Sequence, residues 1–322
     1  MTRKLIGIEI GSTYIKMIET ERKKTRIKIK KFSLLNTPPN CIRDGMIYQI
    51  VPIKQVILEE FKKKRYTSKQ VIVVVQSSQI IVRNLTLEKQ SEKMARPWIQ
   101  MQMEALLPIQ KNEYELDFKK IGALEEAGVI KDEWMLIAAP HIIILPVMGL
   151  IKALKLKPEA ITISSEAVCR LFHAPSHTYN EELDATLVLD IGGQSTTVTI
   201  LTGEKTYLTR MIGFGVAHLE KINDEEAYFS KVVRPQIEYN ILSEVERILQ
   251  FYYSTKEAKY IKRVYLIGGG AQIEGMEGYI RDALNLPVES RDFLESIIDL
   301  PSEAFKKQIH LFMNVLGAVY DS

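Results

Sequence analysis

Short apolar runs of strand length, separated by tight polar turns, recur in both halves of the chain. Leu5–Ile10 predicts a buried strand, and the alternating pattern over Thr13–Glu19 predicts a second strand after a turn. A third strand is predicted at Arg26–Leu35. The second half repeats this order, with a hairpin predicted at Leu187–Leu201 and a further strand at Thr206–Ile212. Each half is therefore expected to contain a hairpin that is followed by a third strand.

The rest of the pattern mixes helical spacing with short buried strands. Helices are predicted at Ile53–Lys64, Ser91–Leu107, Pro146–Leu154, Glu238–Tyr253, Met276–Leu284 and Phe305–Tyr320. Further strands are predicted at Gln70–Val75, Ile80–Leu87, Glu115–Lys120, Trp134–Ala138 and Arg263–Ile267. The segment from about 83 to 156 has its own strand–helix–strand–helix content. We therefore expect it to be a subdomain inserted in the first half.

Composition is that of a folded protein with more than one domain. With 322 residues, 46% hydrophobic and 26% charged, the chain is too long for one ordinary core. The net charge of +3 argues against a dedicated nucleic-acid binder. Cys41 and Cys169 have no ligand spacing, so neither a zinc site nor a disulfide framework follows, and a reducing compartment is expected. The longest apolar region, 135–151, is interrupted by prolines and is too short to span a bilayer. A cytoplasmic protein is therefore expected, which meets a membrane only through a partner.

Two of the predicted turns carry the same chemistry. In each, an apolar run leads into an acid, a branched apolar residue, glycine and then hydroxyl residues. The two stretches are Ile8–Thr13 and Leu189–Thr196. Successive backbone N–H groups in such a turn can bind an anion, and glycine lets the backbone approach a phosphate closely. The acids Glu9 and Asp190 can hold Mg²⁺ through water, and Lys16 can add a point charge. The alternative is that both are ordinary hairpins with turn-forming residues. That interpretation would suit a single copy of the motif better than two matched copies.

A third glycine-containing turn follows the strand predicted at Arg263–Ile267. Gly268, Gly269 and Gly270 leave room for a ribose or a flat ring beside the backbone, at a helix start that favours negative charge. A simple strand-to-helix turn is the alternative interpretation. The spacing is not that of the Rossmann fingerprint, and Met276 stands where a P-loop requires lysine.

The order hairpin, hairpin, glycine turn and terminal helix resembles the actin-like ATPase superfamily over essentially the whole chain. Within it the chain is similar to the type IV pilus assembly protein PilM family, which is related to the division protein FtsA. The stretches that carry this likeness are Gly7–Ser12, Gln102–Pro108, Arg247–Tyr252 and the glycine turn.

This resemblance implies an α/β fold of two actin-like (ribonuclease H-like) lobes. The first lobe would span 1–182, with an FtsA-type inserted subdomain at about 83–156, and the second would span 183–304. A terminal helix at 305–322 would return to the first lobe. The resemblance further implies an ATP-binding cytoplasmic scaffold. Such a scaffold binds the cytoplasmic N-terminal tail of a PilN-like inner-membrane protein and connects toward the pilus motor ATPases.

The same resemblance assigns roles to individual residues. ATP would be held by Gly11, Ser12, Thr13, Lys16, Gly192, Gly193, Gln194, Ser195, Gly268, Gly269 and Gly270. Mg²⁺ would be held through water by Glu9 and Asp190. Glu104 is a candidate for polarising a water, although a carboxylate in salt contact at a helix end is the simpler interpretation.

Three departures from the family pattern bear on hydrolysis more than on binding. Glu9 stands where aspartate is usual, Gln102 stands where an acid is expected, and Gly213-Phe214-Gly215 replaces adjacent glycines. At most a slow ATPase is therefore expected.

Two other functions compete with the scaffold. A small-molecule kinase of the sugar-kinase type fits the size, but it requires a base beside the acceptor hydroxyl, and the pattern supplies no convincing aspartate for one. A division-type filament protein is the other competitor. Sedimentation with and without ATP would distinguish it from a scaffold.

Overall fold

The computed structural model describes residues 3–23, 26–89, 91–107, 109–126, 128–172, 184–203, 205–220 and 228–320. Its first lobe contains a six-stranded sheet of order β10-β6-β1-β2-β3-β15. The strands β1 (Arg3–Ile10), β2 (Tyr14–Lys23) and β3 (Arg26–Asn36) form an antiparallel meander, and β6 (Gln70–Val75) lies parallel to β1. The three strands predicted at the start of the chain are thus confirmed.

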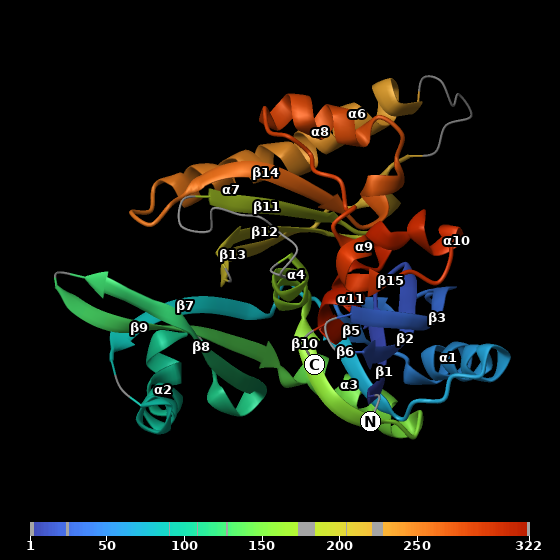
Figure 1. Ribbon diagram of the computed structural model, residues 1–322, viewed down its shortest axis with the longest axis horizontal. Helices are drawn as coiled ribbons and strands as arrows, with labels where there is room; N and C mark the ends of the chain where they lie inside the picture. Colours follow the sequence, from blue (N-terminus) through green and yellow to red (C-terminus); the bar gives the residue numbers. More distant parts are fainter. Residues whose placement is uncertain are drawn as a thin grey trace.

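The second lobe repeats this arrangement in a four-stranded sheet of order β13-β12-β11-β14. Here β11 (Asp184–Ile191), β12 (Thr196–Thr202) and β13 (Lys205–Ile212) form the meander, and β14 (Tyr260–Ile267) lies parallel to β11. In both lobes the first hairpin turn therefore occupies the same place relative to its sheet. The two lobes are stacked one above the other in Figure 1.

A separate three-stranded antiparallel sheet extends from the first lobe. It consists of β7 (Ile81–Glu88), β9 (Val129–Pro140) and β8 (Tyr114–Glu126), in that order. The helix α2 (Glu92–Leu106) covers one face of it through Ala95 and Ile99 (Figure 1). Since proline cannot continue a helix, the sequence predicts that Pro108 ends this one. Pro108 lies outside the described residues.

The inserted unit ends earlier than the boundary near 156 that the sequence predicts. Its sheet stops at Pro140, where α3 (His141–Ala153) begins. α3 packs into the core of the first lobe through Ile143, Val147 and Leu150, and β10 (Lys157–Ile163) pairs with β6. The predicted start of this helix at Pro146 is wrong, because Pro146 lies inside α3.

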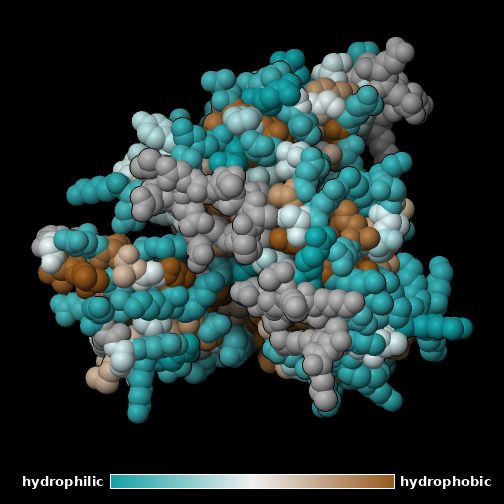
Figure 2. Space-filling view, in the orientation of Figure 1, coloured by the Kyte–Doolittle hydropathy of each residue, from teal (hydrophilic) through white to brown (hydrophobic). Residues whose placement is uncertain are grey.

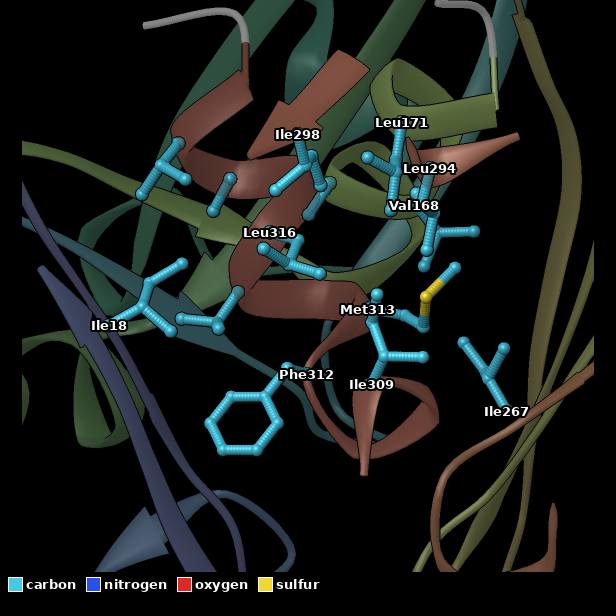
Figure 3. Packing of buried hydrophobic residues seen from close by; sticks show 14 of the residues in the cluster. Ile18, Val168, Leu171, Ile267, Leu294, Ile298, Ile309, Phe312, Met313 and Leu316 are labelled. Carbon is cyan, nitrogen blue, oxygen red and sulfur yellow. The ribbon is translucent and has the colours of Figure 1, made fainter. Parts of the chain in front are cut away.

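The space between the two large sheets is filled by two helices, α4 (Ser164–Phe172) and α11 (Met313–Tyr320). Figure 3 shows Met313 and Leu316 of α11 among Val168, Leu171 and residues from the surrounding strands. The buried cluster includes side chains from both lobes. The lobes therefore share one apolar layer rather than meeting across a hinge alone.

The predicted continuous helix over 305–320 is wrong. This segment is divided into α10 (Glu303–Lys306), a 3₁₀ turn η6 (Ile309–Leu311) and α11. The carbonyl of His310 accepts a hydrogen bond of 2.9 Å from the backbone N–H of Gly268, in the glycine turn of the second lobe. This long-range bond uses a carbonyl that a continuous helix would need for its own ladder.

The chain also re-enters the first lobe before residue 304, the expected end of the second lobe. β15 (Ile298–Asp299) pairs with β3, and α9 (Leu294–Ile297) lies just before it. The second lobe therefore ends before α9. Both strand pairing and apolar packing place the following segment on the first lobe.

The remaining elements complete the two lobes. In the first lobe these are β4 (Ile42–Arg43), β5 (Met46–Ile47) and α1 (Ile50–Lys64), and η1 (Lys111–Glu113) belongs to the insert. The second lobe has η2 (Val216–His218), the π-helical turns η3 (Phe229–Val233) and η4 (Glu238–Leu242), α6 (Arg234–Ile237), α7 (Ser243–Tyr253), η5 (Gly269–Gln272) and α8 (Met276–Leu284).

The surface drawn in Figure 2 is mainly hydrophilic, with a hydrophobic patch over the far end of the inserted sheet. Val129 and Ile130, which begin β9 there, are each 52% exposed. Among the described residues, no helix combines the length and the apolar character needed to cross a membrane.

Candidate functional site

The turns β1–β2 and β11–β12 meet at one cavity between the lobes, with a volume of about 380 Å³. This lies within the usual range of about 300–1,000 Å³ for small-molecule sites. The predicted site residues that line it are Glu9, Gly11, Ser12, Thr13, Lys16, Asp190, Gly192, Gly193, Gln194, Ser195 and Gly269. The structure therefore brings together two motifs that are far apart in the sequence.

The two turns have matching local geometry. The N–H of Gly11 donates to the carbonyl of Tyr14 over 3.0 Å, and the N–H of Gly192 donates to the carbonyl of Ser195 over 2.9 Å. A Cβ atom on Gly11 or Gly192 would lie only 3.0 or 2.9 Å from the same carbonyl oxygen. Glycine is thus favoured at equivalent positions for the same steric reason, which explains the repeated sequence pattern.

The turns also contact each other. A Cβ atom on Gly193 would collide with Oγ1 of Thr13, so only glycine allows this approach of the lobes. On its other side, the carbonyls of Gly192 and Gly193 accept hydrogen bonds of 2.9 and 2.8 Å from the backbone N–H groups of Val216 and Ala217. The segment after β13 therefore holds the second turn in place through backbone hydrogen bonds. The sequence predicts that Gly213-Phe214-Gly215 opens a helix here, but the described residues continue as the 3₁₀ turn η2.

A buried group of charged and polar side chains from both lobes lies next to the two turns. Nζ of Lys16 lies 2.6 Å from Oε1 of Glu9. The side-chain amide of Asn314, on α11, donates to Oδ2 of Asp190 over 2.8 Å and to Oε1 of Glu9 over 3.5 Å. Asn314 thus joins the acids of the two repeated motifs. The sequence prediction missed it, although a polar residue within the apolar run of 311–319 was an available signal.

The surroundings shift the pKa values of this group. Burial raises the pKa of Glu9, and the nearby carboxylate of Asp190 adds to this, while Lys16 and Asn314 oppose it. Burial acts to lower the pKa of Lys16, but the carboxylates of Glu9 and Asp190 outweigh it and raise that pKa. Lys16 is therefore protonated. Glu9, Asp190 and Lys16 together carry one net negative charge when both acids are ionised.

Two buried oxygens of this group have no hydrogen-bond partner among the described residues, Oε2 of Glu9 and Oδ1 of Asn314. Buried polar atoms are normally satisfied, so such oxygens need an explanation. Mg²⁺ prefers oxygen ligands and retains several waters beside phosphates. A surplus of negative charge together with unsatisfied oxygens therefore fits this cation. When bound, it would neutralise phosphate charge next to Glu9 and Asp190.

The three glycines of the glycine turn have different surroundings: Gly268 and Gly270 pack closely against β11, and Gly269 lines the cavity. Gly268 has a positive φ of 79°, and a Cβ there would collide with Oδ1 of Asp190. A Cβ on Gly270 would lie 2.5 Å from the side chain of Ile191. Only Gly269 of the three lines the cavity. The turn therefore holds the end of β11 in place as well as bordering the site.

Several lining residues were not predicted, and one predicted residue is not placed. Arg43, Asp44, Gln76, Ser78 and His218 also line the cavity. Gln76 donates to Oγ1 of Thr197 in the second lobe. The side chain of Glu104 lies outside the part of the chain that the structure describes, so its predicted role stays a prediction.

A family model for the type IV pilus assembly protein PilM matches residues 7–297, which is most of the chain. The chain belongs to the PilM family of type IV pilus assembly proteins. The family resemblance expected from the sequence is thereby confirmed.

Solved structures support the same fold. The structure of a PilM–PilN type IV pilus biogenesis complex matches with a TM-score of 0.83 and 22% identity, over 98% of this chain and 97% of that chain. The ethanolamine utilization protein EutJ from Carboxydothermus hydrogenoformans matches with a TM-score of 0.56 and 14% identity, over 99% and 90% of the two chains. The actin-like two-lobed fold expected from the sequence is thus confirmed for this PilM family member.

A histidine beside the site makes stability sensitive to acid. Burial lowers the pKa of His310 to about 4, and the charges of Arg291 and Lys16 add to this effect. Between the unfolded pKa of about 6.5 and the folded value, the unfolded chain binds more protons, so stability falls as the pH falls. We expect His310 to account for about 2 kcal/mol of lost stability between pH 7.5 and pH 5.

Denaturant unfolding of the wild type and of His310→Gln at both pH values measures this contribution. The variant should lose correspondingly less stability on acidification. Equal losses in the two proteins would contradict the assignment.

Proposed function

We propose that this protein is an ATP-binding scaffold of the type IV pilus assembly machine. It holds the cytoplasmic tail of a PilN-like inner-membrane protein, and through that protein it is peripheral to the membrane. The resulting complex would connect the membrane protein toward the pilus motor ATPases. The observation that carries the nucleotide part is the meeting of both acid-and-glycine turns, with Lys16, at one cavity.

The cavity has the groups that a triphosphate needs. Backbone N–H groups and hydroxyls of Ser12, Thr13 and Ser195 offer donors from both sides, and Lys16 offers a positive charge. Glu9 and Asp190 would hold Mg²⁺ through water. Glu104 remains the candidate for polarising a water in a slow hydrolysis. The proposal therefore assigns binding as the main role of the site.

ATP with Mg²⁺ is expected to stabilise the protein. At a free ligand concentration one hundred times the Kd, the gain is about 2.7 kcal/mol, which raises Tm by roughly 5–10 °C. Asp190→Ala should abolish this shift because it removes an acid that holds the cation and contacts Asn314. Differential scanning calorimetry with and without nucleotide measures both effects.

A matched control is Asp282→Ala, since Asp282 lies on the exposed surface of α8. This variant should keep the full shift. If the wild type shows no shift with millimolar ATP and Mg²⁺, the nucleotide part of the proposal fails.

For the partner tail we propose the outer face of α3. Ile142, Leu145 and Met148 project from this helix and are 58%, 62% and 40% exposed. α3 connects the inserted sheet to the first lobe, so the surface lies at their junction. Exposed apolar groups at such a junction suit the apolar side chains of a short tail that leads into a membrane helix. Membership of the PilM family and the solved PilM–PilN complex support this choice of partner.

A peptide copied from the cytoplasmic tail of a PilN-like protein should bind the full chain in a calorimetric titration. Leu145→Asp should weaken binding at least about tenfold, because a carboxylate would be buried against apolar groups. Met101→Asp is the control, since Met101, on α2 of the insert, is an apolar residue at least as exposed as Leu145. Equal loss in both variants would refute the α3 surface, and absence of wild-type binding would refute the partner.

A further inference from the structure

Asn314 touches the acids of both lobes from a third element. Its side-chain nitrogen donates to Oδ2 of Asp190 over 2.8 Å and to Oε1 of Glu9 over 3.5 Å. Glu9 belongs to β1 of the first lobe and Asp190 to β11 of the second. All three residues are at least nine-tenths buried. The amide is therefore a bridge between the two repeated motifs at the base of the cavity.

The position of this amide is fixed by the close packing of α11. A Cβ atom on Gly7 of β1 would lie 2.9 Å from Cγ2 of Val315 and 2.8 Å from Cγ1 of Val319. On another side of the helix, a Cβ on Gly317 would collide with the backbone carbonyl of Ala167 in α4. Met313 and Leu316 are packed within the shared apolar layer (Figure 3). α11 thus cannot slide without breaking contacts on several sides, and it presents Asn314 in one place.

The chemistry of an amide suits a site that must stay negative. Two N–H groups can stabilise two carboxylates without adding positive charge. A lysine or arginine in this position would cancel the negative charge that remains beside Lys16. In addition, the oxygen Oδ1 of Asn314 is buried without a partner among the described residues, as is Oε2 of Glu9. The bridge therefore leaves both charge and oxygen atoms available to a cation.

We propose that Asn314 is a positioning residue for the divalent cation of the nucleotide site. It holds the carboxylates of Glu9 and Asp190 at a fixed separation through its side-chain amide, from a helix that is packed tightly between the lobes. This inference rests on the proposed nucleotide function and adds a residue of the terminal helix to that site.

The test separates cation binding from nucleotide binding. In Asn314→Leu, which has the same branching and number of side-chain heavy atoms and no donors, the apparent Kd for Mg²⁺ in the presence of ATP should rise at least about tenfold, or 1.4 kcal/mol. The Kd for ATP measured in EDTA should change less than about twofold. Fluorescent-nucleotide titrations at a series of Mg²⁺ concentrations give both constants.

Two further variants keep the test decisive. Asn314→Ser retains one donor and should show an intermediate loss of Mg²⁺ affinity. It can be measured even if the leucine variant does not fold. Ile280→Ala removes a buried side chain of α8 that does not line the cavity, so it should lower stability while leaving the Kd for Mg²⁺ unchanged.

A wild-type measurement needs no folded variant. Mn²⁺ added with ATP should broaden the side-chain amide resonance of Asn314. Wild-type Mg²⁺ affinity in Asn314→Leu or Asn314→Ser, or an unbroadened resonance, would overturn the role of Asn314 while leaving ATP binding intact. Failure of the wild type to bind ATP would overturn both.

Discussion

Replacing Lys16 with methionine is expected to lower the free energy of unfolding by about 3–5 kcal/mol, the cost of breaking a buried ion pair on one side. Lys16 lies 2.6 Å from Glu9, and the two side chains are only 11% and 7% exposed. Without the ammonium group, the carboxylates of Glu9 and Asp190 would face each other with only the Asn314 amide between them. Because burial already raises the pKa of Glu9, the loss should shrink at low pH, where that carboxyl gains a proton.

Two comparisons show that the loss comes from the unpaired charge. The double variant Glu9→Met/Lys16→Met removes both charges and should be much closer to the wild type in stability. Arg247→Met removes an exposed ion pair with Glu244 and should change little. Urea unfolding of the four proteins measures the effects. If the single and double variants at the cavity were equally unstable, lost packing rather than charge would be the cause.

Gly317→Ala is expected to destabilise the protein by roughly 3 kcal/mol, at the upper end of the usual cost of overpacking. The added methyl group would collide with the backbone carbonyl of Ala167, which cannot rotate away as a side chain can. α11 and α4 would have to move apart within the layer that both lobes share. Since α11 carries Asn314, this variant should also weaken the Mg²⁺-dependent part of nucleotide binding.

The same substitution elsewhere should have the opposite effect on stability. At Gly278 of α8, a Cβ would meet only the end of the Arg281 side chain, at 3.5 Å. Alanine there should stabilise the protein by about 0.5–1 kcal/mol, the usual preference of a helix for alanine over glycine. Thermal unfolding of both variants measures the contrast. A neutral or stabilising Gly317→Ala would show that the helices can separate at little cost.

The part of the site that was predictable from sequence is the part encoded locally. Each turn favours glycine because of a carbonyl three residues away, and each acid precedes its glycine by two positions. The same short sequence pattern therefore predicts the same turn geometry at two places in the chain. The repetition also indicated that the two turns would face each other, which the cavity between the lobes confirms.

What sequence could not supply depends on contacts between distant segments. The bridge from Asn314 to Asp190 joins residues 124 positions apart, and the one to Glu9 joins residues 305 apart. The break in the terminal helix at His310 depends on a bond to Gly268 in the other lobe. Similarly, α3 has helical spacing in any context, and only its packing against the first-lobe core shows that the insert ends at Pro140. Periodicity within a segment does not contain this information.

A crystal structure of the protein with a non-hydrolysable ATP analogue and Mg²⁺ would show directly whether both turns hold the nucleotide. We predict that the turns around Gly11 and Gly192 contact the same phosphate chain from opposite sides, with the cation beside Glu9, Asp190 and Asn314. A nucleotide bound away from both turns, or held by one turn alone with Asp190 remote from it, would show that the paired turns are not the nucleotide site.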